Sequence, residues 1–205
     1  MSMRWSSTIA ICVILLAGPA SAVAGSPTPE VKAILDQAIE VQTRPALQGP
    51  EGRPERARFI REIVKANFLS ADMARESLKD HWEKLNPKQQ AEFRDLFIDL
   101  FQDSYTRMVL NFLRRETIEY LGERPEKDRV RVQTKIMRIN EHIPVDYSVV
   151  ERNARWLVLD VTIDGVSIVG NYQNQFRRVI ATQSFDELMK KMKIQSQAIK
   201  EEPAS

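Results

Sequence analysis

The stretch WLVLDVTIDGVSIVGNYQNQF, residues 156–176, changes its hydrophobic period within one continuous segment. Its first eight residues alternate between an apolar face and a mixed face that carries Asp160 and Thr162, which predicts a strand. The apolar face consists of Leu157, Leu159, Val161 and Ile163. The pair Asp164-Gly165 is typical of a turn, and from Ile168 apolar residues recur at the three- and four-residue intervals of an amphipathic helix. Two apolar surfaces therefore meet at a corner, which either side chains or a ligand must fill.

Three further strands are predicted immediately before this stretch. Residues 117–121 read as a short strand, followed by a polar turn at residues 122–128. Residues 130–136 and 143–149 alternate between apolar and polar side chains, as expected of strands with one face in water. Four consecutive strands without an intervening helix indicate an antiparallel meander. We expect a curved four-stranded antiparallel sheet.

Amphipathic helices are predicted on both sides of the meander. Asn86-Pro87 with Gln89 is a strong helix start, because asparagine caps the helix, proline suits its first position and glutamine completes a capping box. Before the strands, the helical segments are 27–41, 59–68, 70–78 and 87–113, and after them a last helix begins at Ser184. The fold class is therefore α+β, with a mainly helical part at residues 28–113, a sheet-plus-helix part at 114–195 and a polar tail at 196–205.

The N-terminus is typical of an exported protein. Residues 8–17 form an uncharged apolar run of ten, which is too short to span a bilayer, and small residues follow it to Ala24. We interpret residues 1–24 as a cleaved signal peptide. The single cysteine, Cys12, lies inside it. The mature chain would then be a soluble exported protein without disulfides, stabilised by its own core.

The remaining residues argue against several functional classes. A formal net charge of +2 with interspersed charges does not favour nucleic-acid binding. His81 and His142 have no partner at metal-ligand spacing, so we predict no metal site. Asp160 and Asp164 could serve acid–base chemistry, but a turn and a structural hydrogen bond are the simpler interpretation. We predict no catalytic residues, no cofactor and no enzymatic activity.

Several segments together resemble one known family. They are FLSADMARESLKDHW at 68–82, LNPKQQAEFRDLFIDLFQDSY at 85–105, IPVDY at 143–147 and the opening stretch at 156–176. Each is weak alone, but the pattern D-G-V-S…N-Y-x-x-Q-F after a strand is specific. The chain resembles the MlaC family, the toluene-tolerance or phospholipid-binding auxiliary proteins of ABC-type lipid transport, over nearly all of its predicted mature length.

The resemblance implies one lipid-binding domain at residues 25–200, with a sheet like that of nuclear transport factor 2 packed against helices. It implies a soluble periplasmic carrier with a phospholipid as cargo, which helps to maintain outer-membrane lipid asymmetry. The implied partners are an inner-membrane ABC transporter with an MCE-domain protein and an outer-membrane lipoprotein complex. Two departures from the family pattern are Gln173, where arginine is common, and Lys79, where glycine is common. Gln173 removes a cation that could have contacted a headgroup or partner.

We expect acyl chains to occupy a cavity between sheet and helices, with Leu157, Leu159, Val161 and Ile163 facing inward. From the sheet, the expected lining residues are Val145, Tyr147, Leu159, Val161, Ile163, Val166 and Ile168, and from the helices they are Tyr105, Met108, Phe112, Tyr172 and Phe176. Buried tyrosines need hydrogen-bond partners, which water at a cavity mouth or a backbone carbonyl could supply. Two alternatives stay open, a carrier of another lipid such as a hopanoid and a periplasmic adaptor with a solid core.

Overall fold

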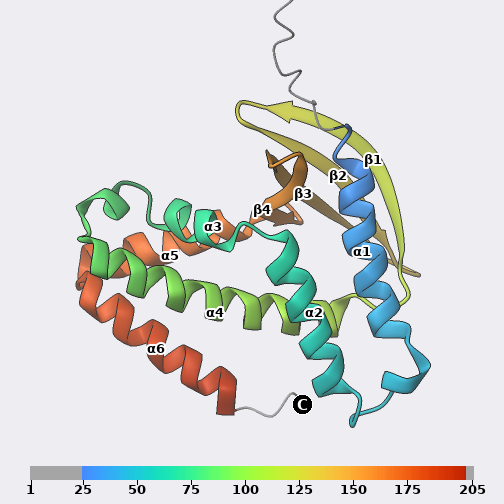
Figure 1. Ribbon diagram of the computed structural model, residues 1–205, viewed down its shortest axis with the longest axis horizontal. Coiled ribbons are helices and arrows are strands. Elements are labelled where there is room, and N and C mark those ends of the chain that lie inside the picture. The colour runs from blue at the N-terminus through green and yellow to red at the C-terminus, as the bar shows by residue number, and fades with distance from the viewer. Residues whose placement is uncertain (1–24, 202–205) are drawn as a thin grey trace, which may run out of the picture.

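A curved sheet and a layer of helices pack together in the computed structural model, which describes residues 25–201 (Figure 1). The predicted signal peptide lies outside the described residues. The helices are α1 (Thr28–Thr43), α2 (Arg53–Asn67), α3 (Ser70–Leu78), α4 (Pro87–Phe112), α5 (Ile168–Thr182) and α6 (Phe185–Glu201), with short 3-10 helices at Pro45–Leu47 and Lys79–Lys84. The strands are β1 (Thr117–Glu126), β2 (Arg129–Met137), β3 (His142–Arg152), β4 (Arg155–Ile163) and β5 (Val166–Ser167).

The sheet is an antiparallel meander in the order β1-β2-β3-β4-β5. The α+β class and the antiparallel order are confirmed, but within residues 25–201 the sheet has five strands where we predicted four. The additional strand is the two-residue β5, which pairs with the end of β4 across the Asp164-Gly165 turn. Both turn residues have positive φ, 48° and 77°, as a tight hairpin of this kind requires. The turn prediction is confirmed, and the strand was missed because two residues carry no readable alternation.

Two irregularities bend the sheet. In β1 the register shifts between Tyr120 and Gly122, and the strand continues to Glu126. The turn that we predicted at residues 122–128 is confined to 127–128, because Gly122, with a φ of 144°, allows a bulge where we expected the strand to end. In β4 the register shifts between Val158 and Asp160, and Leu159 has no partner in β3. Bulges increase local twist, which helps the long strands curve around α1 (Figure 1).

Helix α4 is the centre of the helical layer and contacts α2, α3 and α6. Its predicted start is confirmed: the Asn86 side chain accepts from the Gln89 backbone N–H, and the Gln89 side chain accepts from Asn86. Phe93, Phe97 and Phe101 follow at four-residue intervals and are at most 1% exposed. Phe68, just after α2, and Phe176 from α5 pack against this row, so α4 holds the layer together.

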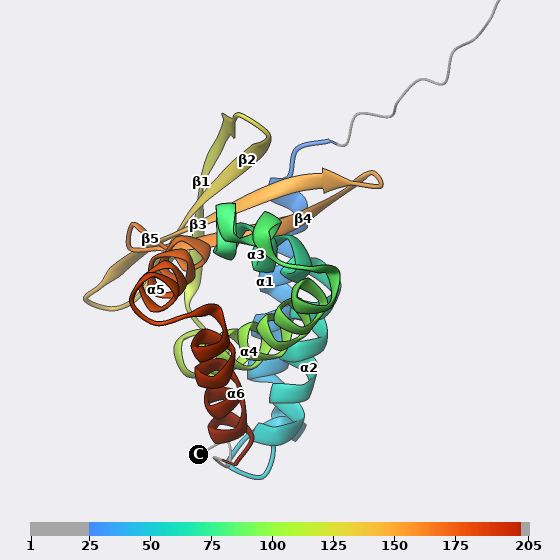
Figure 2. The ribbon, with the colours of Figure 1, turned by 90° about the vertical axis from the view of Figure 1, so that its left-hand side faces the viewer.

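Figure 2 shows the helices beneath the sheet, with α1 and α2 on one side and α5 and α6 on the other. Helix α6 extends to Glu201, so residues 196–201 are helical, whereas we expected them in a polar tail. Ser196 is buried on this helix. In the described part of the chain, the helices lack the combination of length and hydropathy needed to cross a bilayer.

Candidate ligand-binding site

An apolar cavity of about 290 Å³ lies between the sheet and the helices. Helices α1, α2 and α4 form one wall, and β2, β3 and β4 form the other. Among the described residues, the charged side chains that line it are Arg138 and Glu141, at the tip of the β2–β3 hairpin. The other lining residues are aliphatic or aromatic. This cavity can hold hydrocarbon, and its charged groups are gathered at the hairpin.

The hydroxyls of the two tyrosines in the cavity wall are joined by a hydrogen bond. Tyr147 from β3 donates its hydroxyl hydrogen bond to Tyr105 from α4. Burial raises the pKa of both phenols far above the ordinary value. The pair therefore stays neutral at physiological pH and lowers the polarity of the wall. The partner of the Tyr147 hydroxyl is thus another tyrosine, which differs from both the water and the backbone carbonyl that we considered.

A second cavity of about 260 Å³ lies beside the first, under the corner between β4 and α5. Tyr105, Met108 and Ile163 line both cavities and therefore stand between them. Tyr172 from α5 lines the second cavity and accepts a hydrogen bond from Ser104, and burial raises the pKa of its phenol. The corner from which the sequence analysis began is thus partly hollow.

The structure divides the twelve predicted lining residues into three groups. The first cavity is lined by Tyr105, Met108, Phe112, Val145, Tyr147, Val161 and Ile163. The second is lined by Tyr105, Met108, Ile163, Val166, Ile168 and Tyr172. Leu159 and Phe176 line neither cavity, since Leu159 is buried at the β4 bulge and Phe176 packs against the rings of Phe93 and Phe97. Whether any of them contacts a lipid stays a prediction.

Much of the helical wall was missed by the sequence analysis. The additional wall residues on α1 and α2 are Ile34, Leu35, Ala38, Ile60, Ile63 and Val64. Their three- and four-residue spacing marked them as an apolar helix face, but spacing does not say which surface that face meets. A backbone hydrogen bond also joins segments that are far apart in the sequence. Leu69, just after α2, donates its N–H to the Val158 carbonyl oxygen at 2.8 Å and so ties α2 to β4.

The carboxylate of Asp160 is held by hydrogen bonds from nearby backbone and side-chain groups. Its Oδ1 accepts from the backbone N–H of Val161 at 2.9 Å and of Val169 at 3.0 Å. Its Oδ2 accepts from the Ser167 hydroxyl, and Ser167 Oγ in turn accepts from the Gly170 N–H at 2.8 Å. Both carboxylate oxygens therefore hold the β4–α5 corner together. Within residues 25–201, no three His, Cys, Asp or Glu side chains gather as a metal site would require.

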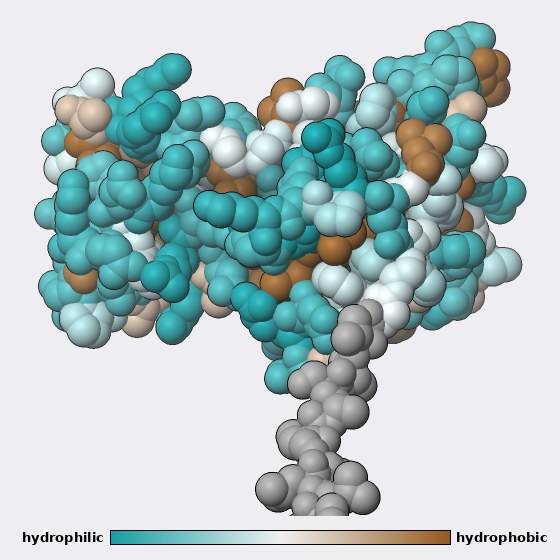
Figure 3. Space-filling model, turned by 90° about the horizontal axis from the view of Figure 1, so that it is seen from above, coloured by the Kyte–Doolittle hydropathy of each residue, from teal (hydrophilic) through white to brown (hydrophobic). Residues whose placement is uncertain are grey.

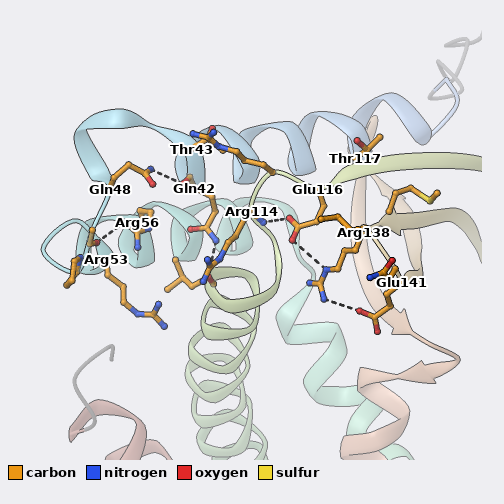
Figure 4. Close-up of a pocket in the computed structure, with 17 residues that line it drawn as sticks. Gln42, Thr43, Gln48, Arg53, Arg56, Arg114, Glu116, Thr117, Arg138 and Glu141 are labelled. Carbon is orange, nitrogen blue, oxygen red and sulfur yellow. Dashed lines mark hydrogen bonds and ion pairs between the residues drawn. The ribbon is translucent and has the colours of Figure 1, made fainter.

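A larger polar cleft of about 1110 Å³ adjoins the first cavity and shares Arg138 and Glu141 with it. Figure 4 shows Arg53 and Arg56 at one side of the cleft and Arg138 at the other, with Arg114 between them near the end of α4. Gln42, buried on α1, donates from Nε2 to the carbonyl oxygens of Val109, Leu110 and Leu113, and so caps α4. Figure 3, a view from above, shows a mostly hydrophilic surface in which hydrophobic residues form small separate groups.

Fold and site define a small α+β protein whose sheet and helices enclose apolar space next to a polar cleft. Comparison with known proteins agrees with this description. The MlaC protein family profile matches residues 32–194, and the chain therefore belongs to the MlaC family.

One solved structure shows the same fold at low sequence identity. It is a phospholipid-binding protein from Ralstonia solanacearum, in complex with a phospholipid. The identity is 20%, the match covers 86% of this chain and 100% of that chain, and the TM-score is 0.72. A comparison with curated proteins finds no match.

Proposed function

We propose that this protein is a soluble periplasmic phospholipid carrier. The observation that carries the proposal is the apolar cavity of about 290 Å³ between sheet and helices. Membership of the MlaC family and the fold shared with a phospholipid-binding protein support it. The predicted signal peptide supports the periplasmic location.

The physical basis of carriage is the removal of acyl chains from water. Each buried CH₂ group gains about 0.8 kcal/mol, so a chain of ordinary length is strongly retained by a dry cavity. Val145, Val161 and the rings of Tyr105 and Tyr147, whose hydroxyls are hydrogen-bonded to each other, present a largely apolar wall to this chain. Such a site needs no reacting group, which is why we propose a binding and transport function and no enzymatic one.

Loading a two-chain lipid requires the cavities to enlarge. The first cavity is at the lower end of the range of about 300–1,000 Å³ for sites that bind drug-sized ligands. Met108 separates it from the second cavity, and a methionine side chain changes rotamer easily. We propose that an acyl chain displaces Met108 and joins the two spaces.

We further propose that the carrier exchanges lipid with an inner-membrane MCE-domain and ABC transporter complex and with an outer-membrane lipoprotein complex. This shuttling would maintain outer-membrane lipid asymmetry. It is the role that the family resemblance implies, and a carrier that hides its cargo between two layers suits it.

The test is the lipid content of protein purified from the periplasm of a Gram-negative host. Organic extraction and mass spectrometry should find close to one phospholipid per chain. Recovery of a hopanoid in place of phospholipid would change the cargo, and lipid-free wild-type protein would refute carriage and favour an adaptor.

A matched pair of variants tests the location. Ile63, half-buried on α2, lines the first cavity, and Ile180, half-buried on α5, lines none of the described cavities. Ile63→Trp should fill the cavity and reduce bound phospholipid at least several-fold, while Ile180→Trp should leave it unchanged. Equal lipid content in the two variants would show that the lipid binds elsewhere.

A further inference from the structure

The cleft beside the apolar cavity has an excess of positive charge. Its described lining residues include five arginines and two glutamates. Both glutamates are engaged by one arginine: Arg138 Nε lies 3.6 Å from Glu116 and its Nη1 lies 3.4 Å from Glu141. The other arginines of the cleft are Arg53, Arg56, Arg114 and Arg115.

Within residues 25–201, these four guanidinium groups have no carboxylate at ion-pair distance. Arg53 donates to the Asn111 side chain at 2.8 Å, while its Nε is buried without a hydrogen-bond partner among the described residues. Arg56 donates to the backbone carbonyl oxygens of Leu47 and Gly49. Arg114 and Arg115 are exposed just after α4. The cleft therefore keeps guanidinium N–H donors that a ligand can use.

The cations also act on one another. The pKa of Arg56 is lowered, first by its partial burial and then by the positive charges of Arg53 and Arg114. An anion between these groups would relieve that repulsion. Planar guanidinium groups are well suited to phosphate, because they can donate two parallel hydrogen bonds to its oxygens.

The position of the cleft indicates the source of the phosphate. Arg138 and Glu141 line both spaces, so a molecule with its hydrocarbon in the cavity has its polar end at the arginines. We propose that Arg53, Arg56, Arg114 and Arg115 bind the phosphate of a phospholipid headgroup and select lipids whose headgroup is net anionic. This inference rests on the proposed function and adds a headgroup preference to it.

The proposed preference for anionic headgroups can be tested with vesicles of defined composition. Lipid-free protein is incubated with vesicles of equal phosphatidylglycerol and phosphatidylethanolamine, re-isolated, and its lipid identified by mass spectrometry. Wild-type protein should take up phosphatidylglycerol in about fivefold excess, the size expected of exposed charge interactions. Arg114→Gln with Arg115→Gln should lower the excess to near parity without reducing the total lipid.

The control is a double variant of two arginines that lie near the C-terminal ends of their strands. Arg124→Gln with Arg152→Gln removes the same charge from exposed positions of β1 and β3 and should keep the wild-type ratio. An equal shift in both double variants would overturn the inference, because the effect would be one of net charge. A wild-type ratio near one would also overturn it while leaving lipid carriage intact, whereas no lipid uptake at all would refute the proposed function.

A separate arm distinguishes headgroup from free phosphate. Inorganic phosphate is titrated into lipid-free wild-type protein by calorimetry. Absence of binding below millimolar concentration, together with a headgroup preference, supports a site completed by the lipid. Sub-millimolar binding that the Arg114→Gln and Arg115→Gln changes abolish, with no headgroup preference, would reassign the cleft to free phosphate and overturn the proposal.

Discussion

Replacement of Asp160 should weaken the corner between β4 and α5 in a way that depends on which atoms are lost. The carboxylate accepts three hydrogen bonds, from the backbone N–H groups of Val161 and Val169 and from the Ser167 hydroxyl. Asp160→Ala removes both accepting oxygens and therefore all three hydrogen bonds. The hydroxyl can rotate to another partner, but the two amides stay where the backbone holds them.

The expected loss in the free energy of unfolding follows from those two backbone amides. A buried donor without a partner costs about 1–3 kcal/mol, so the two amides of Asp160→Ala should lower the free energy of unfolding by about 2–6 kcal/mol. Asp160→Asn keeps a carbonyl oxygen for both amides, loses the charge and replaces the oxygen that accepts from Ser167 with an NH2 group, to which the Ser167 oxygen can turn as acceptor. Hydrogen bonds to charged groups are stronger than neutral ones by about 1 kcal/mol each, so this change should cost about 1–2 kcal/mol.

Urea denaturation followed by circular dichroism measures the difference. Asp164→Asn is the control, since Asp164 is exposed and asparagine tolerates its positive φ of 48°. It should change stability by less than about 0.5 kcal/mol. Equal losses for Asp160→Asn and Asp160→Ala would refute the reasoning, because the position of the accepting oxygen would then be irrelevant.

Two further predictions concern the walls of the cavities. Burial raises the pKa of Tyr105 and Tyr147, so the unfolded chain loses these protons first and stability should fall as pH rises above about 10, by up to about 1.4 kcal/mol per pH unit for each tyrosine. Tyr147→Phe should reduce that slope in urea titrations between pH 8 and 11, and an unchanged slope would contradict the assignment. Gln42→Ala removes the donor to three carbonyl oxygens at the end of α4 and should cost about 1–3 kcal/mol in thermal or chemical unfolding. The exposed Gln175→Ala is its control, and similar losses for both would exclude the capping role.

Local features of the fold could be predicted because their causes lie within a few residues. The capping box at Asn86 and Gln89, the turn at Asp164-Gly165 and the amphipathic spacing of α4 all depend on neighbours in the chain. The α+β class and the antiparallel order followed from the same local patterns. The ends of the strands were harder to predict from the sequence, since the bulge at Gly122 extends β1 beyond the residues that alternate.

The cavity could be predicted only in part. Seven of the twelve residues expected to line it do line the first cavity, because they lie on apolar faces near the turn or opposite it on α4. The contribution of α1 and α2 was not foreseen, since an apolar helix face is equally consistent with any apolar neighbour. Leu159 shows the limit of alternation, because the bulge in β4 leaves it without a strand partner.

The sequence by itself determined the element types, the turn, the helix starts and the family, since these depend on short-range preferences and motifs. Only the tertiary structure decided that the corner at Asp164 stays partly hollow and that Arg53 and Arg114, far apart in the chain, line one cleft beside the first cavity. The physical reason is that cavities and charged clefts arise from contacts between elements, and no local pattern specifies which surfaces meet or how completely they fill the space between them.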